Sequence, residues 1–120
     1  MLVITNNPKV KAALEERELC AVEYHDIPLM EVFTTVRDRI HKGYRLLTHP
    51  LSGSVKPNET HFKSIGISDK PGSAIDFNSL ELIEQAIAAC RKFPLRYEVL
   101  TPQLAEDFQT VDLTLILSVF

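Results

Sequence analysis

Residues 3–24 read VITNNPKVKAALEERELCAVEY and contain the local signals from which the rest of the fold is predicted. The β-branched pair at 3–4 predicts a short strand, which stops at the polar residues that follow. Asn7 is a good helix N-cap, and Pro8 suits the first helical position because its missing N–H costs nothing there. Apolar residues recur at helical spacing until a second strand-like run at 21–25. The stretch therefore predicts a strand, a tight turn, a helix and a second strand.

The next segment carries the clearest periodicity in the chain. Its apolar residues lie at i, i+3, i+4, i+7 and i+11: Leu29, Val32, Phe33, Val36 and Ile40. This spacing predicts an amphipathic helix, and the cationic turn before Gly43 predicts where it ends. Residues 45–48 are expected to form a third strand and residues 64–68 a fourth, which the glycine within it favours at a sheet edge.

The C-terminal third predicts one clear helix and one ambiguous element. A helix is expected over residues 78–93, ended by Pro94. Beyond Pro102, residues 104–115 fit helical spacing, whereas residues 111–119 alternate as a strand would. A helix is favoured because nothing breaks the chain after the proline.

Strands and helices alternate through the first half of the chain, which is typical of an α/β fold. We expect one domain over residues 1–120, built as a three-layer α/β/α domain with helices on both faces of the sheet. Right-handed crossovers predict a mostly parallel sheet of about four strands in the order 2-1-3-4.

Composition narrows the function classes. The chain has 120 residues and a formal net charge of −3, so it has no overall attraction to nucleic acid. A basic stretch at residues 37–45 spans a helix end, where cations usually serve the helix dipole. No apolar run is long enough for a membrane span, and no signal peptide is recognised. Cys20 and Cys90 form no Cys-x-x-Cys pair and are expected as reduced thiols in a cytoplasmic protein.

The predicted strand order implies a binding site. Loops that leave neighbouring parallel strands at a switch point form a crevice where α/β proteins usually bind ligands. Ser-Gly-Ser can aim backbone N–H groups at an anion, and a helix N-terminus adds positive potential. We therefore expect a phosphate or a carboxylate between the loops after strands one and three. The candidate ligand-binding residues are Asn6, Asn7, Thr48, His49, Ser52, Gly53, Ser54, Lys56, Asn58 and Glu59.

A plainer interpretation stands beside this one. Polar loops also arise because their backbones face water, and Asn7 could serve only as a helix cap. Neither nucleotide-binding glycine motif is present, and His49, Glu59 and His61 match no recognised metal pattern. The Gly-x-Ser-x-Gly elbow of serine hydrolases is absent as well. We therefore expect no cofactor and no metal.

Two runs resemble the GrdX family: RDRIHKG at 37–43 and LLTHPLSGSVKPNET at 46–60. Shorter matches occur at 4–8, 76–77 and 106–109. Proteins of that family are encoded beside the glycine, sarcosine and betaine reductase systems of anaerobic bacteria. The resemblance implies an accessory role in that selenoenzyme pathway, and it assigns no catalytic residue.

Three functions follow from these observations. The first is a non-enzymatic accessory protein that binds a small anion or docks on a reductase component. The second is a small enzyme that uses His49 as acid or base, with Lys56 steadying the anion and Asn6 or Asn7 orienting it. The third is a structural partner module, in which the apolar tail at 111–120 packs into the core or forms a homodimer.

Overall fold

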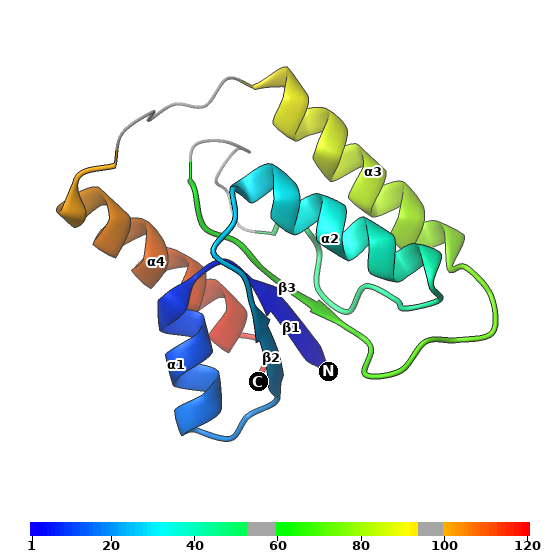
Figure 1. Cartoon of the computed structure of the whole chain (residues 1–120), viewed down its shortest axis with the longest axis horizontal. Helices are drawn as coiled ribbons and strands as arrows, with labels where there is room; N and C mark the ends of the chain where they lie inside the picture. Colours follow the sequence, from blue (N-terminus) through cyan, green and yellow to red (C-terminus); the bar gives the residue numbers. More distant parts are fainter. Residues whose placement is uncertain (53–59, 94–99) are drawn as a thin grey trace.

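The computed structural model describes residues 1–52, 60–93 and 100–120. Its helices and strands are, in chain order, β1 (Leu2–Thr5), α1 (Pro8–Glu16), β2 (Ala21–Tyr24), α2 (Leu29–His41), β3 (Ser64–Ile67), α3 (Phe77–Lys92) and α4 (Pro102–Leu117). Helices α1 and α4 lie on one side of the sheet, and α2 and α3 lie on the other (Figure 1). The predicted α/β class, with helices on both faces, is confirmed.

The sheet differs from the predicted one. In the described part of the chain it has three strands in the order β2-β1-β3, with β1 parallel to β2 and antiparallel to β3. The prediction of a mostly parallel, four-stranded sheet in the order 2-1-3-4 was therefore wrong. The predicted fourth strand is β3 and pairs directly with β1, whereas residues 45–48 make only an isolated bridge between Leu46 and Ile67.

Burial explains why residues 64–67, and not residues 45–48, pair with β1. All four residues of β3 are buried, and its two isoleucines join the core under α2 and α3, which favours this segment as the partner of the central strand β1. Residues 45–48 include Arg45 and the half-exposed Leu47, so they tolerate only the edge. β3 is the last strand in the described order β2-β1-β3, so the edge position predicted from its glycine is confirmed. Gly66 also admits a close approach, because a Cβ there would lie 3.1 Å from a Thr48 methyl carbon.

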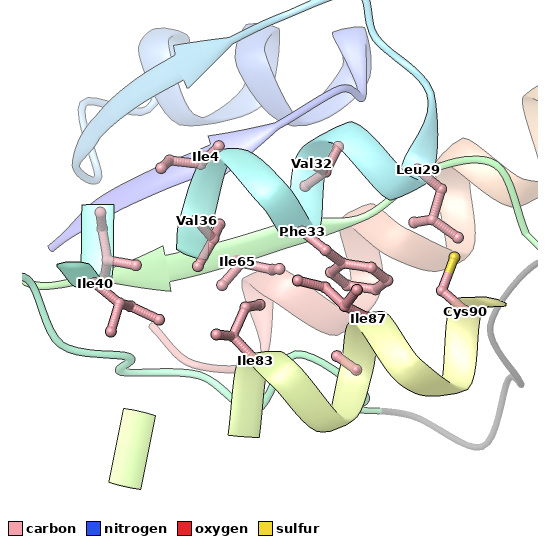
Figure 2. Packing of buried hydrophobic residues seen from close by; sticks show 12 residues of the cluster. Ile4, Leu29, Val32, Phe33, Val36, Ile40, Ile65, Ile83, Ile87 and Cys90 are labelled. Carbon is pink, nitrogen blue, oxygen red and sulfur yellow. The ribbon is translucent and has the colours of Figure 1, made fainter. Parts of the chain in front are cut away.

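Each face of the sheet has its own core. Alternate residues of β1 point to opposite faces, so Ile4 joins the core under α2 and α3, while Val3 joins the core under α1 and α4. Figure 2 shows the larger core, in which Phe33 of α2 points toward Ile87 of α3 and Ile65 of the sheet lies beneath. The apolar stripe predicted for α2 is buried along its whole length.

The C-terminal segment is a helix, as favoured. Thr101 caps α4 through its hydroxyl, which accepts a hydrogen bond from the Leu104 N–H at 3.2 Å. Ile116 is buried against α1, whereas Val119 and Phe120 at the end of the tail are about half exposed. No helix in the described ranges is long and apolar enough to cross a membrane.

The basic stretch at the end of α2 makes contacts within the protein. Arg39 donates to the Glu23 carboxylate on β2 at 2.6 Å, and Arg37 lies 3.6 Å from Glu84 of α3. Two of these cations therefore tie α2 to its neighbours, which supports the structural interpretation of the stretch.

The turn after α2 generates a stability prediction. Gly43 has φ +103°, and a Cβ there would lie 2.5 Å from the Gly72 carbonyl oxygen. We expect Gly43→Ala to lower the free energy of unfolding by about 2 kcal/mol or more, from backbone strain and the clash. Gly66→Ala is the matched control, because its nearest contact is the flexible Met1 side chain. Urea denaturation of both variants measures the difference, and an equal loss would contradict the prediction.

Candidate functional site

The carboxyl end of β1 carries a buried polar network. Thr5 and Ser64 are register partners there, and their hydroxyl oxygens are 2.7 Å apart. Asp112 of α4 accepts three hydrogen bonds: from the Ser64 hydroxyl at 2.7 Å, the Asn7 side-chain amide at 3.0 Å and the Ser64 N–H at 3.1 Å. One carboxylate therefore joins α4 to β3 and to the start of α1.

The hydroxyl protons of this network have a defined direction when Asp112 is ionised. Ser64 gives its only hydroxyl proton to Asp112, so Thr5 must donate to Ser64. Thr5 in turn accepts from the Asn7 N–H at 2.9 Å. The donors thus run in one series toward the carboxylate, an arrangement in which each bond polarises the next.

The two predicted asparagines use their side chains to hold the loops together. Asn6 donates to the carbonyls of Ile27 at 2.9 Å and His61 at 2.7 Å, and it accepts from the Lys63 N–H at 2.9 Å. Both of its amide protons are therefore used, and the residue is buried.

Asn7 is equally occupied. Its side-chain oxygen accepts from the Lys9 N–H at 3.0 Å, as the predicted N-cap should, and its amide protons go to Asp112 and to the Gln109 carbonyl. These bonds support the plainer interpretation of both asparagines, because neither has an amide proton left for a ligand.

Lys63 lies between this network and the loop that follows residue 48. It is buried, and its Nζ donates to the Ser52 carbonyl at 2.9 Å. Burial lowers the pKa of the Lys63 amine, while the charge of Asp112 opposes that change. Burial likewise raises the pKa of the Asp112 carboxyl, against the opposing effects of its hydrogen bonds and of the Lys63 charge. The two groups therefore affect each other's charge, although they make no direct ion pair.

Two cavities adjoin these groups. The first has a volume of about 130 Å³ and is mainly apolar; its described lining residues are Leu29, Phe33, Pro50, Leu51, Ser52, Thr60, Phe62, Lys63, Phe108, Val111, Asp112 and Leu115. The second, of about 390 Å³, is lined by Thr48 and His49 among others. Ser52, Asp112 and Leu115 line both cavities, so the network lies between them.

The described part of the predicted loop lines these cavities. Thr48 accepts a hydrogen bond from the Gly66 N–H at 2.9 Å through its hydroxyl, which fixes the loop to β3. The exposed His49 accepts from the Leu51 N–H at 3.0 Å through Nδ1. The remaining predicted residues lie outside the described ranges: Gly53, Ser54, Lys56, Asn58 and Glu59. Within those ranges, no three His, Cys, Asp or Glu side chains are grouped so as to hold a metal.

Sequence reasoning missed Lys63 and Asp112. Asp112 had a usable signal, because it is the acidic residue on the face of α4 that also carries Phe108 and Ile116. A carboxylate on the buried face of an amphipathic helix needs a partner. Lys63 had a weaker signal, because it directly precedes β3, and a lysine at the end of a strand usually reaches solvent.

The Asp112 carboxyl makes stability depend on pH. Its pKa in the folded protein is raised, so the folded state binds the proton more tightly than the unfolded chain does. This contribution to stability is fully present below the unfolded pKa and is lost as the pH rises through the folded pKa. We therefore expect the stability of the wild type, relative to that of Asp112→Asn, to fall as the pH rises from about 4 to 7.

Urea denaturation across this pH range measures the difference. Asp107→Asn is the control, because Asp107 is exposed on the same helix. A wild-type advantage over Asp112→Asn that grows with pH would overturn the assignment.

Comparison with known proteins places the chain in a family. The model of a family described as GrdX-like protein matches residues 2–120, which is essentially the whole chain. No curated protein and no solved structure matches it. The family match suggests an association with glycine reductase systems. The chain therefore belongs to the GrdX-like family.

Proposed function

We propose that the protein is a non-enzymatic accessory protein of the glycine, sarcosine or betaine reductase systems that binds a small anion at Lys63. The observation that carries the proposal is a buried ammonium group beside an apolar cavity. Sites of this kind, with a few polar groups in an apolar pocket and a shifted pKa, are typical of ligand binding.

The hydrogen bonds of Lys63 support an anionic ligand. An ammonium group has three N–H donors, and within the described residues Nζ uses one of them, on the Ser52 carbonyl. The nearest buried acid, Asp112, already accepts three hydrogen bonds from Asn7 and Ser64. Among the described residues Lys63 has no direct counter-ion, and a buried cation in that position is costly, so an anion that reached Nζ would gain a strong, charge-assisted bond.

The proposed site at Lys63 differs from the site that the sequence predicted. Near the end of β1, where an anion was predicted, the Asp112 carboxylate accepts hydrogen bonds from Asn7 and Ser64. Ser52 belongs to both versions of the site, because its carbonyl holds Lys63 and it lines both cavities. The predicted contribution of residues 53–59 stays a prediction.

An enzymatic role is the second candidate. One observation favours it: His49 lines the second cavity together with Ser52 and Asp112. Its Nδ1 accepts a backbone hydrogen bond, so in the neutral ring Nε2 carries the proton and can donate a hydrogen bond to a bound molecule. In the non-enzymatic account His49→Ala leaves anion binding unchanged, whereas an enzyme would lose turnover. Docking on a reductase component and self-association through the tail are further alternatives.

The proposal predicts a ligand-dependent gain in thermal stability. A small anion at about a hundred times its dissociation constant should add about 2.7 kcal/mol, which is a shift of several degrees in Tm. We expect one or more of inorganic phosphate, acetate and propionate, each against a chloride reference, to produce it. Lys63→Met should abolish the shift, because methionine fills similar space without the charge.

Lys70→Met is the matched control, because Lys70 is exposed and lies close in sequence. The control should keep the whole shift. A screen without any shift, or a shift that survives in Lys63→Met, would refute anion binding at this site.

A further inference from the structure

The lining of the first cavity restricts what can occupy it. Its polar members meet around Lys63: Ser52 is bonded to Nζ, and the Asp112 charge acts on the same amine. The rest of the described lining is almost wholly hydrocarbon, contributed by α2, α4 and the segments beside β3. An occupant with one charged end and an apolar body matches this division.

The volume sets the size of that occupant. An apolar cavity of about 150 Å³ accepts benzene, which has about six non-hydrogen atoms. At about 130 Å³, this cavity holds a molecule of similar or slightly smaller size. A nucleotide or a long acyl chain is too large to be enclosed.

The charges favour a carboxylate over a phosphate. Phosphate is close to a dianion at neutral pH and needs several donors, and no described lining residue is an arginine. Asp112 would also repel a dianion more strongly than a monoanion. An amino acid is disfavoured for a different reason, because its ammonium group would lie against hydrocarbon or compete for a carboxylate that already has three donors.

We propose that the cavity beside Lys63 binds a short monocarboxylate of about four to six non-hydrogen atoms, with its acid group on Nζ and its hydrocarbon part on the apolar lining. This inference rests on the proposed function, which requires only that some small anion binds at Lys63. It adds the chemical class of the ligand and a limit on its length.

Isothermal titration with straight-chain acids tests the inference. From acetate through propionate to butyrate, affinity should rise about fourfold for each methylene buried. Octanoate should bind no more tightly than butyrate, because the part of its chain beyond the cavity gains no further apolar contact. Propionamide and glycine match propionate in size; the first lacks the charge and the second adds an ammonium, so both should bind at least about tenfold more weakly.

Two variants separate the acid group from the hydrocarbon. Lys63→Met should remove the preference for propionate over propionamide. Val111→Phe narrows the cavity from a residue that is about half exposed and leaves the lysine in place. This variant should weaken butyrate more than acetate and so lower the gain per methylene. Either variant suffices if the other does not fold.

The outcomes distinguish the two proposals. Inorganic phosphate that binds more tightly than every acid, and depends on Lys63, overturns the inference but leaves anion binding intact. Glycine that binds as well as propionate, or affinity that does not change with chain length, also overturns the inference alone. If no anion binds, both proposals fail together.

Discussion

The carboxylate of Asp112 joins the C-terminal helix α4 to Ser64 of β3 and to Asn7 at the start of α1. It lies on α4 near the end of the chain, yet its partners are Asn7 after the first strand and Ser64 in the third. Three donors meet one buried acid, and burial still raises its pKa. The removal of either side would leave buried polar groups unpaired, a cost of several kcal/mol in other proteins. This contact therefore fixes α4 over the sheet together with the apolar core that Ile116 shares with α1.

The same contact determines where a ligand can bind. Open α/β folds usually bind anions beyond the carboxyl end of the first strand, at a helix N-terminus. Here the Asp112 carboxylate accepts hydrogen bonds from Asn7 and Ser64 near that end of β1. The unusual group is the Lys63 amine. Lys63 is buried, donates to one carbonyl and has no direct counter-ion among the described residues. The proposed binding site is therefore the cavity between α2 and α4 and not the expected crevice.

Local signals in the sequence predicted most of the elements, but not the sheet. The N-cap at Asn7, the stripe of α2 and the stop after α3 depend on neighbouring residues, so they could be recognised. The place of residues 64–67 beside β1 depends on a competition with residues 45–48, which only the assembled core decides. Three of the predicted ligand-binding residues, Thr48, His49 and Ser52, line a cavity, and their role in binding stays a prediction. Lys63 and Asp112 were not predicted, since their proximity depends on the position of α4.

The chain belongs to the GrdX-like family, and the buried Lys63 is the group on which the proposed anion binding depends. The most direct test of the account is a crystal structure of the protein grown with butyrate. We predict density for the acid in the cavity between α2 and α4, with a carboxylate oxygen within hydrogen-bond distance of Lys63 Nζ and Asp112 still bonded to Asn7 and Ser64. An empty cavity, or Lys63 in a direct ion pair with Asp112, would contradict it.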